Sequence, residues 1–439
     1  MSRIRWFMCL VFFVAAVSMT RAERPVYTLD ACLEIGLREA SAMRNAQRDR
    51  KAADSVIDQV RAQFLPQVSA DGTYTRLDKL DSVTFGDQEI EIGSLDNYSL
   101  SVNLRQLVYS GGSVSAALDA AREYRIMADI EVDRVQAGLA RDIRAQFTDI
   151  LFLQAALEVN AESVRLQEDT LRQTQMRQAQ DLASEFDVLN AKVQLANARP
   201  GLIQASNRVA MAKTAFADLL NLPDEPFDLA GALGYEPLEI HERAWIRQAL
   251  QNRPELAVAR QGLSLRETEI RAEQSAYRPA LSLSANYGAQ RSPLSFGDGD
   301  DLDWRWSATL QAQWQWLDGG LRRSRIREKR IERDKTLEDI DTLKRRVALE
   351  VRQACQALQH AEAAVHATRE TTQLAEKSME IAQVRYRNGL VTRLELSEVH
   401  VALMTARLLA LEALRDHAQA RTQMRFATGT MAQGQVDAE

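Results

Sequence analysis

Two very long stretches without proline constrain the fold of this 439-residue chain more than any other feature. Residues 113–180 and 321–388 contain no proline and almost no glycine, and each stretch is 68 residues long. At a rise of about 1.5 Å per residue, each would form a helix of about 100 Å, which no compact domain accommodates. The sequence therefore predicts an elongated, mainly helical protein.

Four shorter helical stretches are each close to half that length. They cover residues 30–63, 185–220, 242–276 and 393–427. Two of them placed end to end would match one long helix, which predicts a cylinder of long helices beside broken ones. In the second long stretch, apolar and small residues repeat at spacings of three and four, which is typical of a coiled-coil seam. The helices alone leave an ordinary coiled-coil rod open as an alternative.

The two halves of the chain look like copies of one another. The matching pairs of segments are 64–67 with 277–280, 109–112 with 317–320, and 182–189 with 390–397. Each copy is predicted to run helix, strand, strand, long helix, helix. The first repeat covers residues 23–221 and the second 242–428, joined by a proline-containing linker over 222–241. Residues 429–439 are expected to be a disordered tail.

Four stretches alternate apolar and polar residues and are predicted to be strands. They lie at about 68–79, 97–109, 280–290 and 304–316. The last carries Trp304 and Trp306 at one end and Trp314 and Trp316 at the other. The ten residues from Trp306 to Trp316, tilted as in a barrel, span about 25 Å, the height between the aromatic girdles of an outer-membrane barrel. The four tryptophans are therefore predicted to mark the two membrane interfaces.

Four strands cannot close a barrel, and lipid does not tolerate an open sheet edge. Several chains must therefore combine their strands: two chains would give eight and a filled interior, and three would give twelve and a passable lumen. The polar loops at about 80–96 and 291–303 are expected to be extracellular. Asp298, Asp300, Asp301 and Asp303 lie in the second loop, but their spacing completes no calcium-binding motif.

The N-terminus has the pattern of a secretory signal peptide over residues 1–22. Arg3 and Arg5 precede an apolar run that is too short to span a bilayer, and small residues follow up to Ala22. Cys9 lies inside that run, which argues against a lipidated cysteine at the new N-terminus. Two other cysteines, Cys32 and Cys355, remain, and the sequence does not decide whether they form a disulfide.

Composition and motifs argue against several other classes of protein. The net charge of -6 gives no support to nucleic-acid binding. The five histidines show no metal-ligand spacing and are interpreted as surface residues on long helices. We find no glycine-rich phosphate loop and no catalytic constellation, so the chain is predicted not to be an enzyme and to need no metal or cofactor.

In order and duplication, these features resemble the TolC family of outer-membrane efflux proteins across nearly the whole chain. The segments that carry the resemblance are 65–67, 109–112, 317–320 and 386–390. The resemblance implies a homotrimer with a 12-stranded β-barrel in the outer membrane, continued by a 12-helix α-barrel through the periplasm. It also implies docking onto a periplasmic adaptor and, through it, an inner-membrane transporter of the RND or ABC type.

The resemblance assigns the periplasmic end of the tunnel to the turns between long and short helices. The predicted adaptor-contact tips are Leu182, Ala183, Ser184, Gly389, Leu390, Val391 and Thr392. The alternative is that these residues only form tight helix turns, for which Gly389 is well suited.

Five further residues are predicted to act at the periplasmic gate. Glu395 and Glu398 match the family's acidic rings in the lumen, and their spacing of three puts them on one helix face. The alternative is that both are solvated glutamates on the outside. Asp187 and Tyr386 match partners in the family's closed-state latch, whereas the latch arginine falls on Val391. Arg393 would replace it only if the turn has a different shape.

The function expected from these features is an exit duct for efflux or type I secretion. A rival from another class is a periplasmic or surface coiled-coil protein with water-soluble strands. A stand-alone diffusion porin is a third candidate, but it would leave the long helices without a role. The sequence does not identify the cargo.

Overall fold

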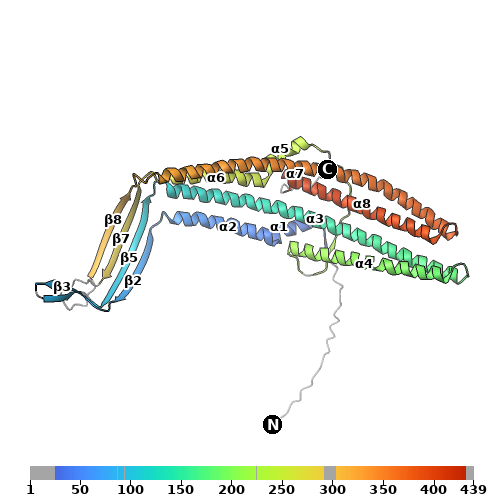
Figure 1. Cartoon of the computed structure of the whole chain (residues 1–439), viewed down its shortest axis with the longest axis horizontal. Helices are drawn as coiled ribbons and strands as arrows, with labels where there is room; N and C mark the ends of the chain where they lie inside the picture. The colour runs from blue at the N-terminus through green and yellow to red at the C-terminus, as the bar shows by residue number, and fades with distance from the viewer. Residues whose placement is uncertain (1–24, 87, 93, 224, 291–302, 432–439) are drawn as a thin grey trace, which may run out of the picture.

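The computed structural model describes residues 25–86, 88–92, 94–223, 225–290 and 303–431. The predicted signal peptide, most of the second polar loop and the last eight residues lie outside these ranges. In the described part, the molecule is a long helical bundle with a sheet at one end and helical turns at the other (Figure 1). None of the described helices combines the length and the hydropathy that a bilayer span requires.

Helices make up most of the chain. They are α1 Leu29–Glu39, α2 Ser41–Ala62, α3 Ser113–Gln178, α4 Glu185–Leu220, α5 Glu242–Asn252, α6 Pro254–Ser275, α7 Leu321–Arg387 and α8 Arg393–Thr428. The long helices α3 and α7 have 66 and 67 residues. Helices α2 and α4 pack along α3, while α6 and α8 pack against both α3 and α7, so shorter helices follow one another along each long one (Figure 1).

Two helices that the sequence predicted as continuous are each broken. The predicted helix over 30–63 is interrupted at Ala40, and the one over 242–276 at Arg253, where both residues adopt extended backbone angles. Pro254 explains the second break, because a proline disfavours helical angles at the residue before it and is well suited to start the next helix. No proline is present at Ala40. There the break brings Ala40 into a core with Cys32, Met43 and Phe147.

The strands form one main sheet and two small ones. They are β1 Val26–Tyr27, β2 Gln67–Arg76, β3 Asp81–Phe85, β4 Gln88–Ile92, β5 Asp96–Tyr109, β6 Asp228–Leu229, β7 Ala280–Gln290 and β8 Asp303–Gln313. The main sheet is antiparallel in the order β2, β5, β7, β8, and the β5–β7 pairing joins the two halves of the chain. The first polar loop, expected to be extracellular, contains the β3–β4 hairpin.

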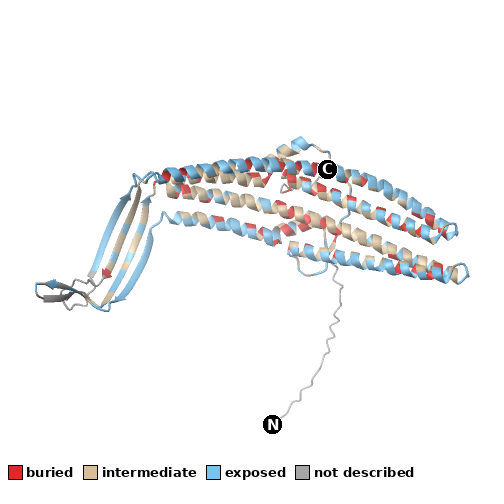
Figure 2. Cartoon of the chain, in the orientation of Figure 1, coloured by how far each residue is buried: buried red, intermediate tan, exposed pale blue. Residues whose placement is uncertain are grey.

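Among the described residues, the main sheet has two open edges and no helix covers it (Figures 1 and 2). In this single chain β2 and β8 pair on one side only. Large apolar residues on one face are exposed, among them Val68, Tyr98, Trp306 and Leu310. A large exposed apolar face in water is unfavourable, so this face of the sheet is expected to contact a partner or lipid.

Strand β8 ends earlier than the sequence predicted. It stops at Gln313, so Trp314 and Trp316 follow the strand instead of lying in it. The Trp314 indole donates a hydrogen bond to the carbonyl of Tyr277, 3.1 Å away, and its ring packs edge-on against Trp316. Asp318 then accepts hydrogen bonds from the backbone N–H groups of Gly320 and Arg322, which turns the chain into α7.

The best-packed layers lie midway along the bundle. One core joins α1, α3 and α4 and includes Ile143, Phe147, Phe216 and Leu220. A second joins α5, α6, α7 and α8 and includes Leu256, Val347 and Met424. Cys32 lies in the first core and Cys355 in the second, and both are free thiols. Burial raises the pKa of the Cys32 thiol to about 11.

Candidate functional site: the helical tips

The two hairpin turns at the far end of the bundle are built in the same way. After α3, Asp181 adopts a left-handed conformation and the N–H of Leu182 donates to the carbonyl of Arg177 at 2.9 Å. After α7, Gly389 adopts the left-handed conformation and the N–H of Leu390 donates to the carbonyl of Arg385 at 2.8 Å. Such bonds satisfy carbonyls that the end of a helix leaves free. The tight turns expected from Gly389 are therefore present.

A capping box begins the helix that follows each turn. The Ser184 hydroxyl accepts a hydrogen bond from the Asp187 N–H, and the Asp187 carboxylate accepts from the Ser184 N–H at 3.0 Å. Thr392 and Glu395 repeat this arrangement at the start of α8. Neither box was identified from the sequence, although Thr392 followed three residues later by Glu395 is its usual signature.

The capping boxes change the interpretation of two predicted gate residues. Because the Glu395 carboxylate accepts a bond from its own N-cap, at least one of its oxygens serves to begin α8. Glu398, one turn on, is exposed. For Asp187, the bonds from Ser184 are the main cause that lowers the pKa of the carboxyl below its ordinary value, and Arg393 and Arg177 add to the effect. Asp187 therefore carries a negative charge at neutral pH.

Tyr386 is buried among residues of α7 and α8. It packs with Met379, Ala382, Leu396 and Leu403, and Val391 contacts the same cluster. The apolar environment explains the valine at the position where the resemblance expects the latch arginine.

Two arginines lie near the candidate latch residues. The Arg177 guanidinium, from α3, lies 5.7 Å from the centre of the Tyr386 ring. Arg393 is close enough for its charge to act on Asp187, and its Nε is buried without a hydrogen-bond partner in the described part of the chain. Within that same part, no hydrogen bond joins Tyr386 to Asp187. In one chain, then, cations contributed by both hairpins lie near Tyr386 and Asp187, but these two residues are not joined directly.

The outer surface of the tips is apolar. Leu182 and Leu390 are 65% and 66% exposed. Phe186 and Leu394, each the second residue of its helix (α4 and α8), are also exposed and were not singled out from the sequence. Ser184 and Thr392 are exposed caps, Gly389 is exposed, and Ala183 and Val391 are half-buried. The tips thus offer four large apolar side chains to a partner.

Two of the five histidines are not surface residues, which corrects the sequence interpretation. His400 and His417 on α8 are buried. The Nε2 of His400 lies 2.9 Å from the Ser163 hydroxyl, whereas His417 packs on the Tyr235 ring and has no hydrogen-bond partner among the described residues. Tyr235 belongs to the segment between the repeats, and its hydroxyl donates to Glu362 of α7. His417 therefore helps to hold that segment against the bundle.

Lowering the pH is expected to destabilise the protein through His417. Burial lowers the pKa of His417 below its ordinary value, with Arg421 acting in the same direction and Glu362 and Glu236 opposing it. A histidine with a lowered pKa takes up its proton more readily when unfolded, so stability is full above about pH 6.5 and falls as the pH drops below it. Thermal unfolding is followed by tryptophan fluorescence. The melting temperature should fall less between neutral and acidic pH for His417→Leu than for the unchanged protein. The exposed His241→Gln serves as control, and an equal loss in all three proteins would contradict this assignment.

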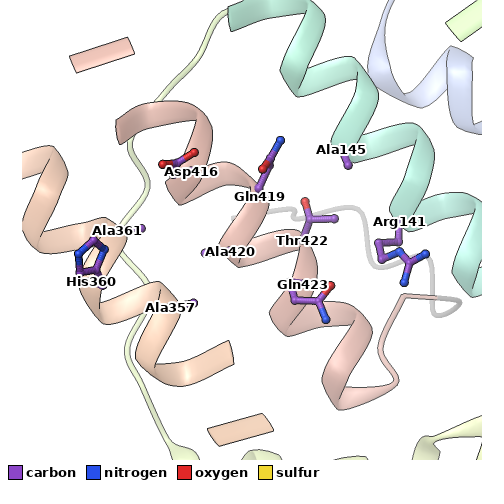
Figure 3. A pocket seen from close by; sticks show the side chains of 10 residues that line it. All are labelled: Arg141, Ala145, Ala357, His360, Ala361, Asp416, Gln419, Ala420, Thr422 and Gln423. Carbon is purple, nitrogen blue, oxygen red and sulfur yellow. The ribbon is translucent and has the colours of Figure 1, made fainter. Parts of the chain in front are cut away.

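An open groove of about 550 Å³ lies between α3, α7 and α8 (Figure 3). The groove is open because small side chains line it: Ala145, Ala357, Ala361 and Ala420. The longer side chains of Arg141, His360 and Asp416 lie around them. Among the described residues no group of histidine, cysteine, aspartate and glutamate side chains is arranged to hold a metal ion.

An uncovered sheet with an apolar face, about 100 Å of helix and helical turns at the far end define a class: subunits of outer-membrane channels that extend into the periplasm. The sequence matches the family described as outer membrane efflux protein over residues 34–222 and 245–430. The chain belongs to this family, which confirms the expected TolC-like fold and the location in the outer membrane. An ordinary coiled-coil rod is thereby ruled out as the fold.

Relatives and solved structures agree with this assignment. The chain is 23% identical to the probable efflux pump outer membrane protein TtgC of Pseudomonas putida, over 82% of this chain and 75% of that protein. It is 28% identical to the protein CyaE of Bordetella pertussis, over 39% of this chain and only 36% of that protein. The fold is similar to that of the CmeC outer membrane channel of Campylobacter jejuni, with a TM-score of 0.74, 13% identity and coverage of 92% of this chain and 85% of that chain.

Proposed function

We propose that three copies of this chain form an exit duct across the outer membrane and the periplasm for efflux or type I secretion. The observation that carries the proposal is the four-stranded sheet with an apolar face and two open edges. Strands in lipid must be paired on both sides, so β2 of one copy would pair with β8 of the next. Three copies would give twelve strands, enough for an open lumen, whereas two would give a filled barrel.

The tips are proposed to dock onto a periplasmic adaptor and, through it, an inner-membrane pump of the RND or ABC type. The exposed side chains of Leu182, Phe186, Leu390 and Leu394 support this role, because exposed apolar patches commonly mark protein contacts. Photocrosslinkers at Leu182 and Leu390 in cells, followed by mass spectrometry, would identify the adaptor. A crosslinker at the exposed Arg208 is the control. Adducts only with the protein's own copies would contradict docking at the tips.

The duct itself is tested by reconstitution. Purified protein in a planar bilayer should give single-channel currents, and electron microscopy should show a trimer with a central bore. A monomer, or a solid bundle without a bore, would contradict the proposal and favour a structural coiled-coil protein.

Asp187 and Tyr386 are proposed to help to hold the tips closed. Asp187→Ala together with Tyr386→Phe is expected to raise single-channel conductance several-fold, because the double change removes the charge near Arg393 and the hydroxyl of the buried ring. Single-channel recording in planar bilayers measures the effect.

Ser184→Ala is the control for this experiment. It removes the N-cap hydroxyl of α4, which typically costs about 1 kcal/mol, but keeps the Asp187 carboxylate. If Ser184→Ala opens the channel as much as the double variant, the helix cap and not the latch controls closure. Unchanged conductance in the double variant would remove both residues from the gate.

A further inference from the structure

The start of α7 carries a concentration of positive charge that the rest of the acidic chain does not share. Residues 321–330 contain six basic residues and one acidic residue, whereas the chain as a whole has a net charge of -6. The equivalent start of α3, residues 113–122, contains one basic and one acidic residue. The charge is therefore not a requirement of the duplicated fold.

Some of these cations have structural partners, but four do not. Arg322 is buried and pairs with Asp318, and Lys329 pairs with Glu269 and Glu332. The remaining four are Arg323, Arg327 and Arg330, on one side of the buried stripe of α7, and Arg325, on its other side; we call them together the arginine patch. All four are exposed, and none of their side chains makes an ion pair or hydrogen bond to another residue in the described part of the chain. Positive charge at the beginning of a helix is also opposed by the helix dipole, which affects Arg323 most.

A second copy of the chain does not supply the missing negative charge. In the half of the bundle next to the sheet, each helix packs on the next in the order α2, α3, α6, α7. The helix that a neighbouring copy would bring beside α7 is therefore α2. That helix carries five basic and three acidic residues, and Asp54 and Asp58 already pair with Arg125 and Arg61. A neighbouring α2 would therefore bring net positive charge beside the patch, which favours an anion from outside the protein as the partner of the patch.

The patch lies directly below the sheet. Trp314, Trp316 and Leu317 are exposed just before α7 begins, and 10 residues of helix separate Gly320 from Arg330, or about 15 Å. Side chains in a helix lean toward its N-terminus, which here is the sheet end. The polar region of one leaflet is about 5 to 8 Å thick, so Arg323, Arg325 and Arg327 would reach it, and the long Arg330 side chain approaches it.

We propose that the arginine patch binds anionic phospholipid headgroups of the periplasmic leaflet of the outer membrane. This inference rests on the proposed function, since it requires the sheet to lie in that membrane with the bundle on the periplasmic side. Guanidinium groups pair with phosphates through two parallel hydrogen bonds, and a cluster of arginines beside an aromatic belt favours anionic over zwitterionic lipid.

Lipid retention by the full-length protein tests the proposal. The protein is reconstituted in nanodiscs of equimolar phosphatidylethanolamine and phosphatidylglycerol, extracted in detergent, and the retained lipids are quantified by mass spectrometry. We expect phosphatidylglycerol to be enriched several-fold, and the enrichment to fall to the bulk ratio when all four patch arginines are replaced by glutamine. High salt should reduce the enrichment in the unchanged protein.

A matched control removes the same number of charges elsewhere. Lys192, Arg208, Arg369 and Lys377 are exposed on α4 and α7 far from the sheet, and their replacement by glutamine should leave the enrichment unchanged. Equal loss in this control, or no enrichment in the unchanged protein, would overturn the proposal. So would a patch variant that retains its lipid but changes ion selectivity, because the arginines would then line the bore. Single-channel currents in a bilayer of pure phosphatidylethanolamine test the proposed duct alone, because this bilayer contains no anionic lipid.

Discussion

Leu310→Arg is expected to abolish recovery of the assembled protein from the outer membrane, whereas Thr309→Arg, one residue away, should leave it intact. Leu310 is midway along the sequence between Trp304 and Trp316 and is 68% exposed. It shares a face of β8 with Trp306, and Thr309 lies on the other face. If the apolar face contacts lipid, an arginine at position 310 lies near the middle of the bilayer.

The expected cost is large because every copy carries it. Arginine on the lipid face at the bilayer midplane costs about 2 to 4 kcal/mol per substitution, and position 309 would instead face the lumen. The measurement is the amount of oligomer in purified outer membranes, on gels that preserve it when samples are not heated. Thr309→Arg should also make the channel less selective for cations. Full recovery of Leu310→Arg oligomers would show that this face of the sheet is not in lipid.

The elements with strong periodicity were predictable from the sequence. The long helices were expected at 113–180 and 321–388, and α3 and α7 start at the expected residues and end within two residues of the expected ends. The left-handed glycines at 112 and 320 precede them, and no proline interrupts them. The predicted strands at about 97–109, 280–290 and 304–316 are likewise present as β5, β7 and β8, in which Val102, Tyr287 and Trp306 are register partners.

Features set by tertiary contacts were not predictable in the same way. Alanine is a good helix former, so nothing local marks Ala40 as a break, and its extended conformation depends on the core that it enters. Trp314 continues the alternation of β8, yet its indole bonds to Tyr277, 37 residues earlier, and the strand has already ended.

At the tips, sequence reasoning missed one local motif and one contact between distant segments. Resemblance led to Asp187 as a latch residue and to Glu395 as a charge in the lumen, but local chemistry gives both a capping role that their spacing to Ser184 and Thr392 already contained. Arg177, which lies over Tyr386, had no signal in the sequence, because it comes from the other hairpin, more than 200 residues away in the chain.

Arg253 is expected to be the most important polar residue for the stability of the second half of the chain. It sits at the break between α5 and α6 and is only 6% exposed. It donates hydrogen bonds to Glu255, to Glu350 of α7 at 2.9 Å and to the carbonyl of Ala427 of α8. The Arg253 side chain thus connects the break between α5 and α6 to α7 and α8.

A cation–π arrangement extends this connection to α3. The ring of Phe426 in α8 lies 5.3 Å from the Arg253 guanidinium and 4.6 Å from that of Arg141 in α3. Such contacts contribute more when the cation is removed from water, as Arg253 is.

Arg253→Met should lower the free energy of unfolding by about 3 kcal/mol, since it leaves Glu350 and Glu255 with an uncompensated charge and the Ala427 carbonyl without its donor. Denaturant unfolding in detergent, followed by circular dichroism, measures the change. Arg247→Met, an exposed arginine of α5, should change stability by less than about 0.5 kcal/mol. If the cost comes from unpaired negative charge, adding Glu350→Gln to Arg253→Met should recover part of it, whereas a cost from lost packing alone would leave the double variant as unstable as the single one.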